Sequence, residues 1–190
     1  LLVERGFQPA EKAEDGDVLI VNTCSVRAKS EEKLFSLLGR LSSWKRRKPL
    51  RLAVIGCAAQ LHGRRILERF PEVDYVLGPD NEYLLPGLLA EDVPGAVAVE
   101  HGSSWQEIGP SRPRRGSAVS AYVTIMEGCD NFCSYCVVPL ARGREKFRPA
   151  EAILAEVEEL IGRGYKEITL LGQNVNSYRD PLTGLDLGGL

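Results

Sequence analysis

Three cysteines lie within eight residues of this 190-residue chain, at Cys129, Cys133 and Cys136, in the spacing C-x3-C-x2-C. A structural tetrahedral metal site takes four protein ligands. Three thiolates on a four-iron cluster instead leave one iron open for a substrate or cofactor. We therefore expect an iron–sulfur cluster that does chemistry. The alternative is a zinc site with a fourth ligand elsewhere, although His62 and His101 have no ligand-like spacing to the three cysteines.

Two further cysteines each follow a short apolar run. Cys24 comes after residues 17–22, and Cys57 comes after residues 51–55. Ligands in open α/β sheets bind outside the carboxyl ends of the strands, so two neighbouring strands would place both thiols on one rim. The alternative is a pair of buried structural cysteines, a common fate of free thiols.

A third candidate segment, Gly172, Gln173 and Asn174, follows the apolar run at residues 167–171. Glycine would let the backbone approach a ligand closely, and the two amides could hydrogen-bond it. We regard these residues as candidate cofactor contacts. A simple turn is the alternative.

The elements that must position these residues alternate in type. Apolar runs predict buried parallel strands, and helical periodicity separates them. The predicted strands cover residues 17–22, 51–55 and 75–77, and the predicted helices cover about 25–45, 58–70 and 81–90, the last with a break at Pro86. This order predicts an α/β fold, a parallel sheet with helices on both faces.

A second unit is predicted after a Gly-, Pro-, Ser- and Arg-rich linker at residues 100–117. Its strands are expected at residues 119–126 and 167–171, with a helix opened by Pro149 and ended by Gly162 between them. This strand–loop–helix–strand order is the start of a β/α barrel, whose chemistry sits in the loops after the strands. We therefore assign residues 1–110 to the α/β domain and residues 117–190 to an incomplete barrel.

The net charge and the cysteines limit which partners and which cellular compartment are expected. The net charge is -2, so nucleic-acid contact would need local basic patches, which solvated surface would explain equally well. Such patches lie at residues 45–48 and 112–115 and at Arg142, Arg144, Lys146 and Arg148. No signal peptide or long apolar run precedes the odd set of five cysteines, which predicts a cytoplasmic protein with reduced thiols and no membrane contact.

The chain begins with residues 1–6, which look like the last turn of a helix stopped by Gly6, and it ends without a closing element. We expect a fragment truncated at both ends.

The sequence resembles the radical S-adenosylmethionine enzymes, and more narrowly the methylthiotransferases among them. The matching strings are NTCSVRAKSEEK at residues 22–33, MEGCDNFCSYCVVP at 126–139, RG at 142–143 and LLGQNVNSY at 170–178. Within that family the strings resemble most the branch that modifies tRNA.

The resemblance implies two [4Fe-4S] clusters in the full-length enzyme. Cys129, Cys133 and Cys136 match the ligands of the first cluster, whose open iron S-adenosyl-L-methionine chelates. Cys24 and Cys57 match two of three ligands of an auxiliary cluster, and the third would lie upstream of this chain.

The resemblance also implies the reaction: methylthiolation at C2 of N6-isopentenyladenosine beside the tRNA anticodon, with the anticodon loop and a flavodoxin-type electron donor as partners. Arg142, Arg144, Lys146 and Arg148 are candidate contacts to phosphate or to the cofactor carboxylate. The alternatives are a methylthiotransferase for another tRNA nucleoside or a ribosomal protein, and a non-catalytic metal-binding module. We expect this fragment alone to be inactive and its open strand at residues 167–171 to invite pairing with another chain.

Overall fold

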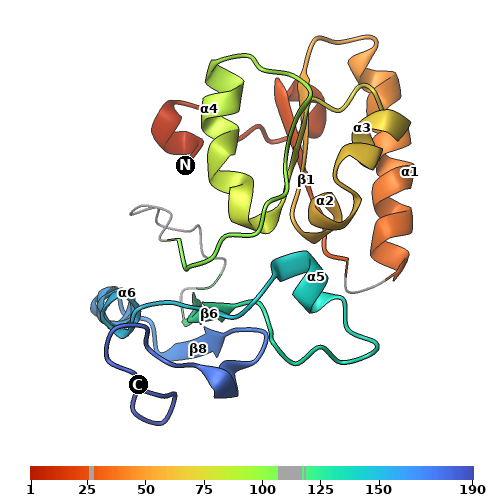
Figure 1. Ribbon diagram of the computed structural model, residues 1–190. Coiled ribbons are helices and arrows are strands. Elements are labelled where there is room, and N and C mark those ends of the chain that lie inside the picture. The colour runs from red at the N-terminus through yellow and green to blue at the C-terminus, as the bar shows by residue number, and fades with distance from the viewer. Residues whose placement is uncertain (26–27, 107–116, 118) are drawn as a thin grey trace. The chain divides into compact units, whose positions relative to one another are not determined.

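The computed structural model describes residues 1–25, 28–106, 117 and 119–190 (Figure 1). The chain folds into two compact units, one formed by Leu1–His101 with Tyr135–Arg142 and the other by Gly102–Ser134 with Gly143–Leu190. Most of the predicted linker, with the basic run at residues 112–115, lies outside the described residues.

A parallel sheet organises the first unit. Its strands are β1 (Val18–Asn22), β2 (Arg51–Ile55), β3 (Tyr75–Leu77) and β4 (Ala96–Ala98), in the spatial order β1-β2-β3-β4 with every neighbouring pair parallel. The predicted parallel sheet is therefore confirmed. The three-residue strand β4 was not predicted, because so short a run takes its strand geometry from pairing with β3 rather than from a pattern of its own.

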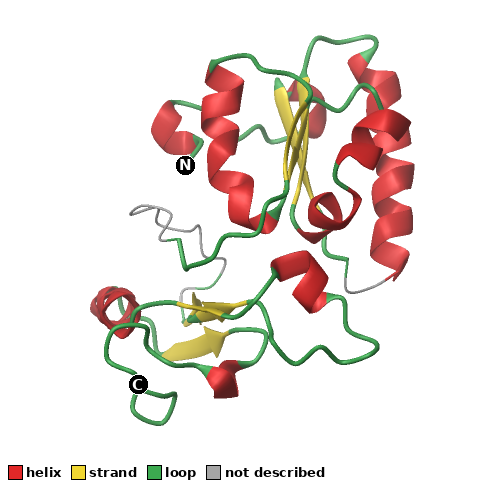
Figure 2. Ribbon diagram, in the orientation of Figure 1, coloured by secondary structure: helices red, strands yellow, loops and turns green. Residues whose placement is uncertain are grey.

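Alternate residues of the central strands feed two separate cores. Leu52 and Val54 of β2 pack with Leu38 of α1 (Ala28–Lys45), whereas Ala53 packs with Leu85 of α4 (Leu85–Ala90). Successive side chains of a strand point to opposite faces, so each face needs its own cover. Figure 2 shows helices on both sides of this sheet, as predicted.

Two predicted helices differ in detail. The continuous helix expected at residues 58–70 is wrong: α2 (Cys57–His62) and α3 (Arg64–Arg69) are separated by Gly63, whose φ of +47 falls in the left-handed region. The helix expected at residues 81–90 begins as the 3-10 turn η3 (Pro79–Leu84), and Pro86 lies in the first turn of α4, where proline is tolerated.

Short helical turns complete the first unit. The turn η1 (Val3–Arg5) ends at Gly6, which has a φ of +88 and donates its N–H to the Val3 carbonyl, so the predicted glycine stop is confirmed. The other turn is η2 (Ala13–Asp15). Among the described residues, no helix combines the length and apolar character needed to cross a membrane.

The second unit contains one complete β/α/β arrangement. β5 (Ser120–Thr124) and β8 (Glu167–Leu171) pair in parallel, and α6 (Ala150–Gly162) connects them, as predicted. The remaining elements are β6 (Met126–Glu127), β7 (Lys146–Phe147) and the 3-10 turn η4 (Val175–Ser177), with β6 and β7 antiparallel.

The single strand predicted at residues 119–126 is wrong in its continuity, because the chain changes partner at Ile125. The Ile125 N–H donates to the Leu171 carbonyl at 2.9 Å, and the Ile125 carbonyl accepts from the Arg148 N–H at 2.9 Å. The chain therefore leaves β8 and joins β7 just before the cysteine loop. This partner is distant in sequence, so local pattern could not reveal it.

The start of α6 is held by residues about 30 positions later in the chain. The Asp180 carboxylate accepts the Ala150 N–H at 2.9 Å, and the Tyr178 hydroxyl donates to the Arg148 carbonyl at 2.8 Å. Hydrogen bonds from the Thr183 hydroxyl and the Ala150 N–H lower the pKa of Asp180, whereas burial raises the pKa of Tyr178. The carboxylate thus takes the place of a local N-cap.

Candidate metal centre

The first two candidate cysteines lie on one rim of the parallel sheet. Cys24 follows β1, and Cys57 is the first residue of α2 directly after β2. The connecting backbones are hydrogen-bonded, because the Thr23 N–H donates to the Ile55 carbonyl and the Ala58 N–H to the Thr23 carbonyl, both at 3.2 Å. The expectation that both thiols share a rim is confirmed by the pairing of β1 with β2.

Gly56 allows this close approach. Its φ is +90, and a Cβ there would overlap the Asn22 side-chain oxygen and press on the Thr23 carbonyl. The two turns can therefore pack together only because residue 56 has no side chain. Cys24 is exposed and Cys57 is buried.

The cysteine loop starts immediately after β6. Gly128 has a φ of +79, and a Cβ at this position would overlap the carbonyl of Arg144. The next residue, Cys129, donates its N–H to the Gly143 carbonyl at 3.2 Å. The start of the loop is thus packed, backbone on backbone, against the residues that precede β7.

The segment after β8 contacts the same loop. The Gly128 N–H donates to Oε1 of Gln173 at 2.7 Å. Gln173 therefore anchors the cysteine loop in this structure. Its role as a cofactor contact stays a prediction. Gly172 also has a packing reason, since a Cβ there would overlap the Met126 side chain.

Sequence reasoning missed Glu145, which links the two segments. Its carboxylate accepts from the Asn174 side-chain amide at 3.2 Å and from the Ser177 hydroxyl at 2.8 Å. Asn174 and Glu145 are far apart in the chain, and nothing local to Glu145 indicated this contact. The result is a polar network of side chains beside the start of the cysteine loop.

The last loop cysteine, Cys136, belongs to a segment that packs with the first unit, Tyr135–Arg142. This segment contains the short helix α5 (Val138–Arg142), which sequence reasoning missed and which packs against α2. Nε2 of His101 lies 3.2 Å from the Leu140 carbonyl and supports the helix. A five-residue helix has too few turns to show a periodic pattern.

The donor chemistry of the candidate residues suits an iron–sulfur cluster. None of the five cysteines forms a disulfide within the described residues; Cys129 is buried, Cys136 is half-buried and Cys133 is exposed. Over residues 1–25, 28–106 and 119–190, no three His, Cys, Asp or Glu side chains are grouped as a ready ligand set.

The basic residues after the loop divide into two groups. Lys146 and Arg148 are buried, and the Arg148 guanidinium pairs with Glu156. These two are neither solvated surface cations nor open phosphate contacts in this structure. The Arg144 side chain, in contrast, is 73% exposed.

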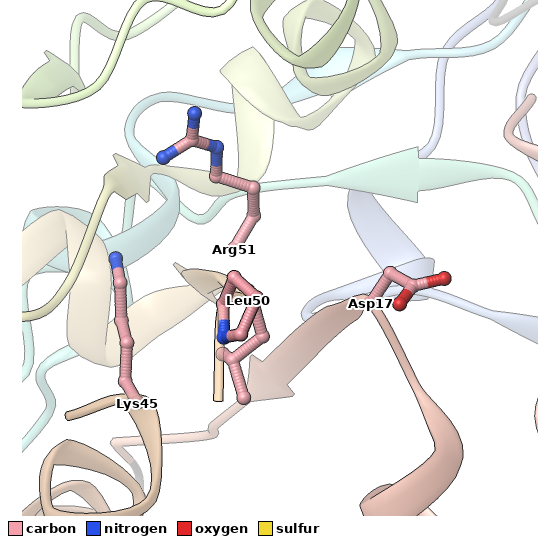
Figure 3. Close-up of a pocket in the computed structure, with 5 residues that line it drawn as sticks. Asp17, Lys45, Leu50 and Arg51 are labelled. Carbon is pink, nitrogen blue, oxygen red and sulfur yellow. The ribbon is translucent and has the colours of Figure 1, made fainter. Parts of the chain in front are cut away.

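A pocket of about 340 Å³ lies at the opposite, amino-terminal edge of the parallel sheet (Figure 3). It is lined by Asp17, Lys45, Pro49, Leu50 and Arg51. The Lys45 ammonium is bound by the buried Asp74 carboxylate, and the Arg51 guanidinium pairs with Asp92. Its cations are thus already neutralised, and the pocket is distinct from the cysteine rim.

Comparison with known protein families gives two separate matches along the chain. Residues 1–78 match the family described as "Uncharacterized protein family UPF0004", and this region includes Cys24 and Cys57. Residues 123–184 match the radical SAM superfamily, and this region includes Cys129, Cys133 and Cys136.

Several curated proteins are similar over nearly the whole chain, and each is named tRNA-2-methylthio-N(6)-dimethylallyladenosine synthase. The protein of Sorangium cellulosum is 44% identical over an alignment of 191 residues, and the alignment covers 95% of this chain and 38% of that protein. The protein of Thermodesulfovibrio yellowstonii is 40% identical over an alignment of 188 residues, which covers 98% of this chain and 43% of that protein. The protein of Pelotomaculum thermopropionicum is 45% identical over an alignment of 196 residues, which covers 99% of this chain and 42% of that protein. The chain thus spans about two fifths of these relatives.

Proposed function

Since the chain belongs to the radical S-adenosylmethionine methylthiotransferase family, we propose that the whole protein methylthiolates C2 of N6-isopentenyladenosine beside the tRNA anticodon. Radical SAM membership implies a [4Fe-4S] cluster and S-adenosylmethionine. The tRNA substrate is the one named for the similar curated proteins. A cytoplasmic location and a flavodoxin-type electron donor complete the proposal.

The observation that carries this proposal is the placement of the cysteine loop. It follows β6 directly, and Gly128 ties it to Gln173 after the parallel strand β8. Loops at the carboxyl ends of parallel strands are where β/α folds place their chemistry. Three thiols and no fourth leave room for a cofactor on a cluster.

Within the proposal, Cys129, Cys133 and Cys136 hold the cluster that binds S-adenosylmethionine. When bound, the cluster and this cofactor supply the radical chemistry. The chain's own contribution is to orient the loop: Gln173 fixes the Gly128 amide, and Glu145 fixes Asn174. Hydrogen bonds of this kind fix the orientation of the segments that carry a site's ligands.

Cys24 and Cys57 are proposed to ligate the auxiliary cluster together with a third residue upstream of this chain. Their shared rim supports this assignment, since the hydrogen-bonded turns hold the two positions next to each other. In the full-length protein, Cys57→Ser should then lose about half of the bound iron while the other cluster persists. Unchanged iron content would refute a second cluster at this rim.

The first experiment is anaerobic reconstitution of the full-length protein with iron and sulfide, followed by addition of S-adenosylmethionine. We expect the spectrum of the reduced cluster to change on addition, and tRNA mass spectrometry to show the methylthio group. Cys133→Ser should lose both results, whereas Ser134→Ala, at the exposed neighbouring position, should keep them. Failure of wild type to bind iron and sulfide would refute the cluster and favour the alternative of a non-catalytic module that binds another metal, such as zinc. Activity only on another nucleoside or on a ribosomal protein would show that this alternative, and not isopentenyladenosine, is the substrate.

The 190-residue chain alone is proposed to be inactive, and detectable methylthiolation by it would refute this. In the described residues β8 pairs with β5 on one edge only. Light scattering on the chain would test whether its other edge pairs with a second copy.

A further inference from the structure

An aromatic ring and a guanidinium are exposed together on the cysteine loop. Phe132 lies between Cys129 and Cys133, and 61% of its surface is exposed. The guanidinium carbon of Arg144 lies 5.0 Å from the centre of the Phe132 ring. Both residues belong to the second unit, and neither contributes to its core.

The pair is held from the protein side. Oδ1 of Asp130 lies 3.3 Å from Nη1 of Arg144 and also accepts the Glu145 N–H at 3.4 Å. The hydrogen bond from Cys129 to Gly143 joins the same two segments. The guanidinium is therefore oriented before any ligand arrives, so its side chain loses less conformational entropy when a ligand binds.

A lone exposed phenylalanine needs no explanation, since much of any protein surface is apolar. Here, however, the exposed ring is combined with an exposed cation, in a stretch where Lys146 and Arg148 are buried. A flat π-face beside a guanidinium suits an unpaired nucleobase, which stacks on the ring while its phosphate meets the charge.

We propose that Phe132 and Arg144 form a stacking platform for an unpaired nucleotide of the anticodon loop, next to the modified adenosine. This rests on the proposed function and assigns to these two residues a direct contact with the RNA. Phe132 lies between the first two candidate cluster ligands in sequence, so a base stacked on its ring is close to the reacting loop.

Stacking of a base on an aromatic side chain sets the expected effect. Loss of the ring should weaken RNA binding by about five- to 150-fold. Loss of the guanidinium removes a charge, so it should lower the slope of log affinity against log salt by about one. These signatures separate the two residues.

The test uses the reconstituted full-length protein and an anticodon stem-loop RNA that carries isopentenyladenosine, with affinity measured by fluorescence anisotropy. Phe132→Ala and Phe132→Leu should both weaken binding, because leucine keeps bulk but has no π-face. Phe132→Trp should bind about as tightly as wild type, because it keeps an aromatic face. Arg144→Ala should reduce the salt dependence of the RNA affinity. Tyr83→Ala, at an exposed aromatic in the first unit, is the matched control and should bind as wild type.

Iron content and cleavage of S-adenosylmethionine without RNA are measured for every variant, and RNA affinities are compared between preparations that bind the same amount of iron. Unchanged RNA affinity in Phe132→Ala would overturn the platform. So would a raised KM for S-adenosylmethionine with unchanged RNA affinity, because the ring would then contact the cofactor. The proposed function fails separately, if wild type binds this RNA through Phe132 and yet adds no methylthio group.

Discussion

Replacement of Gly128 by alanine tests whether the cysteine loop is positioned by backbone packing. Gly128 and Gly184 have nearly the same φ, with values of +79 and +75. An L-residue in this left-handed region costs about 1–2 kcal/mol at either site. Nothing lies within 4 Å of a Cβ at Gly184, so Gly184→Ala measures this conformational cost alone.

Gly128→Ala carries a further cost. Its Cβ would overlap the Arg144 carbonyl, which is backbone and cannot rotate away. Overpacking of this kind costs about 1–3 kcal/mol, and displacing the loop weakens the hydrogen bonds to Gln173 and Gly143 by about 1 kcal/mol each. We expect Gly128→Ala to lose about 3–5 kcal/mol more than Gly184→Ala.

Urea denaturation measures the free energy of unfolding of both variants. A local assay is alkylation of Cys129, which is 8% exposed, with the exposed Cys133 as reference in the same molecule. A local loss of about 2 kcal/mol raises the open population about 30-fold, so Cys129 should react correspondingly faster. Equal stability and equal alkylation rates in the two variants would show that the loop is not held by this packing.

Three further predictions follow from the ion pairs and the polar network. Hydrogen bonds from Thr183 and Ala150 lower the pKa of Asp180, so its stabilisation is present above the ordinary value of 3.8 and is lost as the pH falls through the lowered value. The difference in Tm between wild type and Asp180→Asn, measured by thermal denaturation, should accordingly shrink in acid. A difference in Tm that grows in acid would contradict this. Asp74→Ala should cost about 3 kcal/mol, because it leaves Lys45 and the Leu52 N–H without their carboxylate, whereas breaking the exposed pair by Arg46→Ala should cost about 0.5 kcal/mol or less. Glu145→Ala should speed Cys129 alkylation, and Glu145→Gln should restore part of the protection through its side-chain oxygen.

Much of the fold could be predicted because its signals are local. The apolar runs at β1, β2, β3 and β8 each read as buried strands, and each forms a parallel pair. The stop at Gly6 was equally local, since a left-handed residue ends a helical turn. The elements that sequence reasoning missed, such as β4 and α5, have three to five residues and depend on a distant partner.

For the candidate site, the sequence alone identified the donor atoms but not their surroundings. The cysteine spacing is covalent information and needs no fold to be recognised. What only the tertiary structure decided is which groups lie against the loop: Gln173 on the Gly128 amide, Glu145 on Asn174, and the Arg144 guanidinium over the Phe132 ring. These partners lie far apart in sequence or depend on a left-handed glycine turn, and their hydrogen bonds form only when β5 and β8 have paired and brought the loops together.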